Sequence, residues 1–126
     1  MKNLCHYLTT MSSYFLLILL SCEVTEAQTV WNVATSFSTP RRAHTCEVYN
    51  GYLYVIGGSS SDDAIKYNDV QYAPINADGS LGSWVTTSAF NTERRNHTSN
   101  VYNGYLYIMG GVTNSGIRLN DVQYAP

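Results

Sequence analysis

The sequence is poor in charge. Asp, Glu, Lys and Arg together make up 13% of the 126 residues, whereas hydrophobic residues make up 44%. This composition is too apolar for a disordered chain and too weakly charged for a nucleic-acid-binding arm. The formal net charge is −2, so we expect no basic surface that would attract a phosphate-rich partner. Nucleic acid is therefore excluded as an expected ligand.

Long hydrophobic runs are also missing, apart from YFLLILL at residues 14–20. This run is too short to cross a bilayer, and with Lys2 ahead of it the pattern is typical of a signal peptide. Small residues before Gln28 predict cleavage there, so residues 1–27 are assigned to a signal peptide and the protein to a secreted or extracytoplasmic location. The alternative is a bacterial lipobox ending at Cys22. Only lipidation of Cys22 would place the protein at a membrane.

Cysteine is scarce, with three residues in the whole chain. Of these, only Cys46 is certain to remain after export, so no internal disulfide framework can form. In the internal repeat described next, the residue equivalent to Cys46 is Ser99, so the repeat does not depend on a thiol. We interpret Cys46 as a small buried filler.

The sequence does contain a repeated phrase, VYNGYLYVIGG at residues 48–58 and VYNGYLYIMGG at residues 101–111. The match continues upstream at a constant spacing, pairing Trp31 with Trp84, Phe37 with Phe90, Arg41-Arg42 with Arg94-Arg95, and His44-Thr45 with His97-Thr98. Downstream, NDVQYAP closes both copies, with one residue fewer in the second. A period of about 50 residues is typical of propeller blades.

Each repeat divides into four short predicted strands, which in the first copy cover residues 44–49, 52–56, 69–73 and 83–88. Asn50-Gly51 is a strong signal for a two-residue hairpin, because both central positions of a type I′ turn need positive φ. Short connections predict an antiparallel meander. The strand at 52–56 is apolar on both faces, which requires a neighbour on each side, as between stacked blades.

The order of these elements resembles the kelch motif. The residues that carry the resemblance are Arg41, His44, Gly57, Gly58, Tyr72 and Trp84 in the first copy, and Arg94, His97, Gly110, Gly111 and Tyr124 in the second. The match covers nearly all of residues 30–126. It implies an all-β fold of four-stranded antiparallel blades around a central channel, with the first strand innermost, and it gives these residues structural roles.

The kelch-repeat region, residues 28–126, is expected to hold about two blades. It would open with an outer strand at 30–37, continue through a first repeat at 41–88, and end in a second repeat at 94–126 that lacks its last strand. Two blades cannot close a ring. We favour a piece of a longer reading frame, with an incomplete propeller. The alternative is a homo-oligomer in which several chains close a propeller together.

The candidate binding residues lie in loops at one end of the blades. The loops after the second strand, SSSDDAIKY and VTNSGIRL, differ most between copies, and variable loops on a fixed scaffold are where recognition usually occurs. We expect a protein or glycan ligand there. The candidates are Arg42, Arg95, Asn96, Asp62, Asp63, Lys66, Asn114 and Arg118. Arg41 and Arg94 are expected to bond carbonyls within their own blades, which leaves Arg42 and Arg95 freer to contact carboxylates or sugar acids. Asn96-His97-Thr98 is also a glycosylation sequon, which matters only in a eukaryote.

No metal or cofactor is predicted. His44 and His97 occupy identical blade positions without nearby carboxylates or thiolates, which makes a poor zinc set. Asp69 and Asp121 are expected to accept hydrogen bonds from backbone amides where the third strand begins. The sequence shows no catalytic constellation either. We therefore expect an exported, non-enzymatic scaffold that binds protein or carbohydrate. The alternative is a fragment of a kelch-fold enzyme, resembling sialic-acid mutarotases or galactose oxidase, whose catalytic residues lie in absent blades.

Overall fold

The computed structural model describes residues 30–126, so the predicted signal peptide and Cys22 lie outside the described residues. Residues 32–126 form one compact unit. Its elements are all strands, as the sequence predicts, and they form two antiparallel sheets that do not close into a ring. Within residues 30–126, no helix has the length and hydrophobicity needed to cross a membrane.

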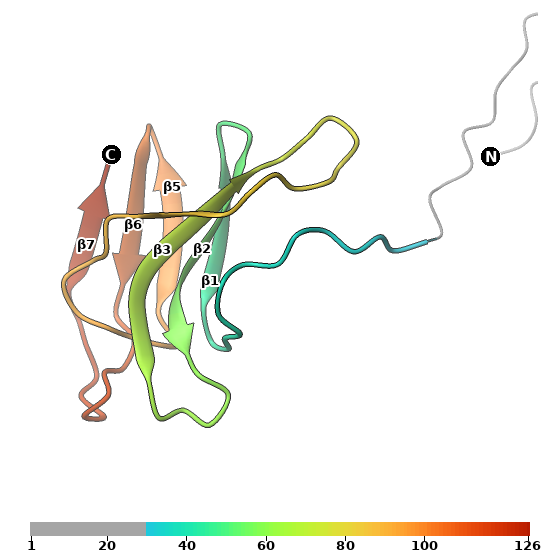
Figure 1. The fold of residues 1–126 in the computed structure, drawn as a ribbon. Helices are drawn as coiled ribbons and strands as arrows, with labels where there is room; N and C mark the ends of the chain where they lie inside the picture. Colours follow the sequence, from blue (N-terminus) through green and yellow to red (C-terminus); the bar gives the residue numbers. More distant parts are fainter. Residues whose placement is uncertain (1–29) are drawn as a thin grey trace, which may run out of the picture. The chain divides into compact units, whose positions relative to one another are not determined.

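Both sheets are meanders in which neighbours in sequence pair (Figure 1). The first sheet, here called blade 1, contains β1 (Thr45–Tyr49), β2 (Tyr52–Ser59), β3 (Lys66–Pro74) and β4 (Val85–Thr87). The second sheet, blade 2, contains β5 (Thr98–Tyr102), β6 (Tyr105–Met109) and β7 (Val122–Ala125). The hairpins turn at the expected Asn-Gly pairs, where φ is 48° and 79° at Asn50 and Gly51. This geometry is that of a type I′ turn.

Strand β2 runs farther than its predicted end at residue 56. It continues through Gly57 and Gly58 to Ser59, with an irregularity in its pairing to β3 between Ile56 and Gly58. Gly58 has a φ of 94°, and a Cβ there would lie 2.6 Å from the carbonyl oxygen of Arg42. Its amide donates to the carbonyl oxygen of Arg94 in blade 2 at 2.9 Å. The glycine pair therefore lets the blade backbones approach each other.

Residues 30–37 differ from the prediction, because none of them belongs to a strand in the structure. A strand here needs an open third-strand edge, but β3 is already paired on both sides by β2 and β4. The segment instead contacts the residues leading into β4. Thr35 Oγ1 donates to the carbonyl oxygen of Gly82 at 2.8 Å, and Trp84 Nε1 donates to the carbonyl oxygen of Thr35 at 2.9 Å.

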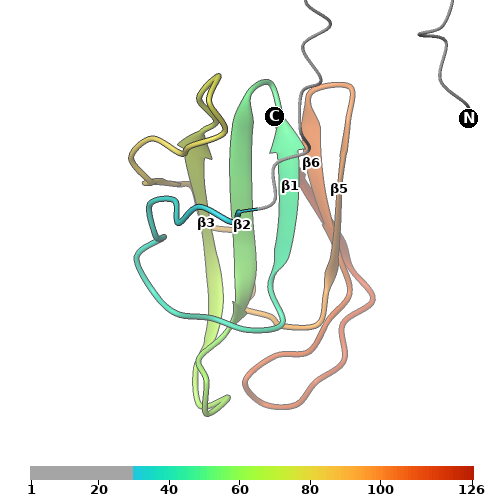
Figure 2. The same cartoon turned by 90° about the vertical axis from the view of Figure 1, so that its right-hand side faces the viewer.

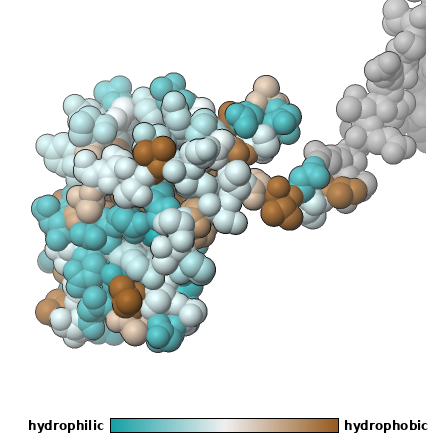
Figure 3. Space-filling model, in the orientation of Figure 1, coloured by the Kyte–Doolittle hydropathy of each residue, from teal (hydrophilic) through white to brown (hydrophobic). Residues whose placement is uncertain are grey.

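The core lies between the two blades, where β1 of one sheet runs beside β5 of the other (Figure 2). Ile56 and Val70 from blade 1 pack with Ile108 from blade 2, and Tyr54, Phe90 and Leu106 extend this cluster. Both faces of β2 are covered, since Val55 is 2% exposed and Ile56 is fully buried. Burial on both faces is the feature that predicted stacked blades. On the face seen in Figure 3, hydrophobic residues lie singly among polar ones.

Candidate functional site at the blade junction

The loops that vary between the copies project from the same end of the sheets, opposite the Asn-Gly hairpins (Figures 1 and 2). Backbone bridges join Arg42 to Ser59 and Arg95 to Val112, so the residues ahead of β1 and β5 lie beside these loops. The predicted binding loops therefore share one end of the molecule. We call this end the loop face.

The first arginine of each Arg-Arg pair is buried in its own blade. Arg41, with 1% of its side chain exposed, forms a bidentate pair with Asp69 at 2.8 and 2.9 Å. It also donates to the carbonyl oxygens of Gly57 and Thr39 at 2.9 and 3.3 Å. Burial alone would raise the pKa of Asp69, but hydrogen bonds from Arg41 and Gln71 together with the Arg41 charge lower it. Arg41 therefore links Asp69 of β3 to Gly57 near the C-terminal end of β2.

Blade 2 repeats this network. The fully buried Arg94 pairs with Asp121 at 2.8 and 2.9 Å and donates to the carbonyl oxygen of Gly110 at 2.8 Å. Gln123 Nε2 also donates to Asp121 at 2.9 Å. These hydrogen bonds, that of Arg94 foremost, hold the pKa of Asp121 well below its usual range. The guanidinium of the motif arginine is thus the main partner of each aspartate, and the expected backbone-amide hydrogen bond makes a smaller contribution beside it.

The second arginines meet at one carboxylate across the blade junction. Arg95 of blade 2 forms an ion pair with Asp63 of blade 1 at 2.8 Å, and Arg42 reaches the same carboxylate at 3.2 Å. Ser59 Oγ also donates to Asp63 at 2.6 Å, and this hydrogen bond, followed by the two arginine charges, lowers the pKa of Asp63. Arg42 keeps 55% of its side chain exposed. Arg95 Nε is buried with no hydrogen-bond acceptor among the described residues.

Lys66 and Asn114 reinforce the same junction. Lys66 Nζ donates to the carbonyl oxygen of Asp63 at 2.8 Å, which closes the loop of blade 1 on itself. The Lys66 backbone amide donates to Asn114 Oδ1 of blade 2 at 2.9 Å. Five of the eight predicted binding residues are therefore connected at one place: Arg42, Asp63, Lys66, Arg95 and Asn114.

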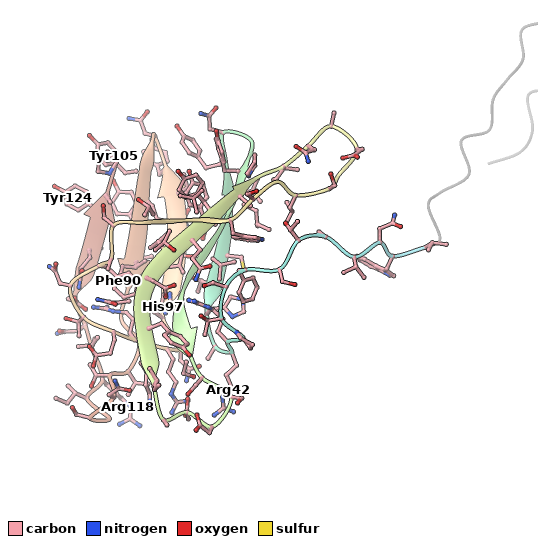
Figure 4. The ribbon with its side chains drawn as sticks, viewed as in Figure 1. Arg42, Phe90, His97, Tyr105, Arg118 and Tyr124 are labelled. Atoms are coloured by element: carbon pink, nitrogen blue, oxygen red, sulfur yellow. The ribbon has the colours of Figure 1, made fainter. Side chains whose placement is uncertain are left out.

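The other three candidates occupy separate positions. Asp62 accepts from Ser60 Oγ and from the Ala64 amide, so it shapes its own loop. Asn96 is exposed with a φ of 54°, and its amide donates to the carbonyl oxygen of Ala43 in blade 1. Arg118 is exposed at the loop face, at the same end as Arg42 (Figure 4). Its guanidinium adds a cation beside the junction.

The two motif histidines lie nearer the strands. His97 is buried, and its Nε2 shares a hydrogen bond of 3.0 Å with Thr45 Oγ1 of blade 1. Burial, with the nearby Arg94 charge, lowers the pKa of His97 to about 4. The pKa of His44 is lowered by the same two kinds of cause, with Arg41 as its cation. Among the described residues, no three His, Cys, Asp or Glu side chains come together in a way that could hold a metal ion.

Sequence reasoning missed three contributors to these networks, Gln71, Gln123 and Ser59. Gln71 and Gln123 each donate to the aspartate of their blade and accept from the preceding loop, from the amides of Ser38 and Asn91 respectively. The signal was available, because both glutamines sit in the identical VQYA stretch. Ser59, the donor to Asp63, had no such signal, since its equivalent in the second copy is Val112.

Comparison with known proteins identifies relatives of the repeat. The family model of the Kelch motif matches residues 40–71 and 93–124, which include β1, β2, β5 and β6, most of β3 and β7, and the motif arginines of both blades. The chain is 29% identical over 90 residues to Kelch-like protein 31 of Danio rerio, covering 69% of this chain and 14% of that protein. It is 28% identical over 86 residues to Kelch-like protein 13 of Bos taurus, covering 68% of this chain and 13% of that protein. The chain thus corresponds to a small part of each relative.

Proposed function

Since this chain belongs to the kelch-repeat family, we propose that it is a protein-binding scaffold that recognises its partner at the loop face. The observation that carries this proposal is the gathering of cations there. Arg42 and Arg118 are exposed, while Asp63 holds Arg42 and Arg95 in place. Guanidinium groups fixed in this way are suited to bidentate contact with carboxylates. The partner segment is accordingly one rich in Asp or Glu.

The test uses the full chain and two synthetic peptides of equal length, one rich in Glu and one in which Gln replaces each Glu. We expect the Glu peptide to bind more tightly in biolayer interferometry, and the difference to disappear in an Arg42→Ala/Arg118→Ala variant. Asp78→Asn is the matched control, because it changes charge in the turn between β3 and β4, away from the loop face. Equal binding of both peptides would reject the acidic partner.

A glycan that carries a carboxylate is a second candidate ligand, because the same arginines suit a sugar acid. An array that contains sialylated glycans and their asialo counterparts separates the two cases. Selective retention of the sialylated members, with no preference for the Glu peptide, would favour the glycan. Release of a chemically altered sugar would instead favour the enzyme alternative.

Export completes the proposal and is supported by the run at residues 14–20. We expect secretion of a tagged full chain with Gln28 as the new N-terminus, read by mass spectrometry. Incorporation of a labelled fatty acid that is lost in Cys22→Ser would instead show a lipid anchor. Retention of the uncleaved chain inside the cell would reject both routes.

A further inference from the structure

The loop after β2 carries its carboxylate at a position that favours glycine. Asp63 and Gly116 occupy equivalent positions of the two repeats, and the amide of each donates to a carbonyl oxygen three residues earlier, that of Ser60 or Thr113. Both residues have a left-handed backbone, with φ values of 67° and 75°. This conformation costs free energy for a residue with a Cβ but little for glycine. An aspartate therefore stands where the turn itself would favour glycine.

The hydroxyl group that bonds this carboxylate is also specific to blade 1. Ser59 is fully buried, and its Oγ donates to Asp63 at 2.6 Å. The equivalent residue in blade 2 is Val112, which has no hydroxyl. Blade 2 forms the corresponding turn without either group, so the turn does not require them. The carboxylate and its buried donor are therefore features of blade 1 that the repeat does not explain.

The two arginines at this carboxylate have unused hydrogen-bond donors. Arg95 and Arg42 lie 2.8 and 3.2 Å from Asp63 Oδ2, but neither side chain makes a hydrogen bond within the described part of the chain. The buried Arg41, by contrast, donates two parallel hydrogen bonds to Asp69. A guanidinium group carries five N–H donors in a fixed geometry. Arg42 and Arg95 can therefore bond a carboxylate better than they bond the one that is present.

We propose that Arg42, Arg95 and Ser59 form the subsite for one carboxylate of the acidic partner, and that Asp63 occupies this subsite until the partner binds. This inference rests on the proposed function, because it assigns a Glu or Asp side chain of that partner to a defined place. The incoming carboxylate replaces that of Asp63 and accepts hydrogen bonds from the two guanidinium groups and from Ser59 Oγ. Asp63 is thus an internal competitor of the ligand.

The internal competitor makes the subsite selective for carboxylates. Arg42 keeps 55% of its side chain exposed, and ion pairs that are partly exposed contribute little to stability, so Asp63 is displaced at low cost. The buried Ser59 hydroxyl would lose its acceptor if nothing took the place of Asp63, which is unfavourable. A neutral ligand would leave both guanidinium groups and this hydroxyl unpaired. Asp63 therefore acts against ligands that lack a carboxylate.

The test compares two substitutions that remove the same charge from neighbouring residues of the full chain. Asp63→Asn removes the internal carboxylate, and asparagine tolerates a positive φ. We expect this variant to bind the Glu peptide about fivefold more tightly than the unsubstituted chain, because a partly exposed ion pair no longer competes. Asp62→Asn is the matched control, because Asp62 accepts from Ser60 and Ala64 of its own loop. An equal gain in both variants would show a general effect of charge and overturn the proposal.

Two further comparisons separate this proposal from the proposed function. In an Arg95→Met chain, the gain from Asp63→Asn should shrink, because one of the two cations that it frees is absent. If the unsubstituted chain prefers the Glu peptide to the Gln peptide but Asp63→Asn binds the Glu peptide equally or more weakly, Asp63 only positions the arginines. That result rejects the exchange and leaves the proposed function standing. If neither chain prefers the Glu peptide, both proposals are rejected, whereas a preference seen only in Asp63→Asn supports the exchange.

Discussion

Arg95 of blade 2 and Asp63 of blade 1 form an ion pair of 2.8 Å across the blade junction. The same carboxylate is 3.2 Å from Arg42, so one aspartate organises two cations from two repeats. The loop of blade 1 and the residue ahead of β5 are thereby held together at the loop face. The shape of the proposed binding surface depends on this contact between blades.

Replacement of this carboxylate tests the junction directly. We expect Asp63→Asn to lower the thermal midpoint slightly, and this loss to shrink as the salt concentration rises, because the removed attraction is a partly exposed ion pair that salt screens. A double-mutant cycle with Arg95→Met should give a coupling energy that shrinks as ionic strength rises. Additive effects of the two substitutions would show that the pair contributes nothing in solution.

Arg94 and Arg95 are neighbours in the sequence but differ in burial, so their substitution compares a buried ion pair with a partly exposed one. Arg94→Met removes a fully buried guanidinium together with its hydrogen bonds to Asp121 and to the Gly110 carbonyl oxygen, so we expect a loss of about 2 kcal/mol or more in unfolding free energy. Arg95→Met, at a side chain that is 29% exposed, should cost roughly 1 kcal/mol or less. Urea denaturation of both variants measures the difference, and equal losses would contradict the assignment of Arg94 as the structural member.

Close backbone approach at Gly58 predicts a large effect of adding one methyl group. Gly58 and Gly79 have similar φ values of 94° and 84°, but only Gly58 has neighbours, with the Arg42 carbonyl oxygen at 2.6 Å from a built Cβ. Gly79→Ala should therefore cost roughly 1 kcal/mol from backbone strain alone. Gly58→Ala should cost roughly 1–3 kcal/mol beyond that from overpacking. Similar thermal midpoints for the two variants would argue against tight contact.

The buried His97 makes stability depend on pH in a defined window. Its folded pKa of about 4 lies below the model-peptide value of 6.5, so the unfolded chain binds more protons between these values. Stability should be full well above pH 6.5 and fall by about 3 kcal/mol toward pH 4.

Asp69 and Asp121 affect stability at lower pH. Their pKa values are lowered in the folded state, so the stability that they contribute is lost only as the pH falls below their usual value of 3.8. His97→Gln can still contact Thr45 but cannot titrate, so its denaturation free energy should be flatter between pH 6.5 and 4.5. An unchanged slope in this variant would assign the effect to another group, with His44 as the next to test.

The repeat made much of this fold predictable. Asn50-Gly51 and the apolar faces of residues 52–56 located the first hairpin and the stacking of blades, because both depend on local backbone chemistry and burial. The Arg94–Asp121 pair was missed, although both repeats carry the residues, because a single strand pattern does not show which donor reaches a carboxylate. The bulge at Gly57 and Gly58 extends β2 for a reason that lies in the neighbouring blade.

The junction itself was less predictable. Arg42, Asp63 and Asn114 were named as candidate ligand contacts, but their mutual contacts arise from loops that differ between the copies. These loop sequences are not repeated, so no alignment of the two copies shows which loop residues lie opposite each other. The hydrogen bond from the Lys66 amide to Asn114 is therefore seen only in the folded structure. The placement of residues 30–37 failed for a different reason, since a strand needs an available edge.

The paired Arg41–Asp69 and Arg94–Asp121 networks bear on how such an array can lengthen. Each unit brings its own counterion for the guanidinium that it encloses, so tandem duplication of the gene segment adds no uncompensated interior charge. Each newly copied unit therefore already pairs its own buried arginine, and selection can act on its variable loop.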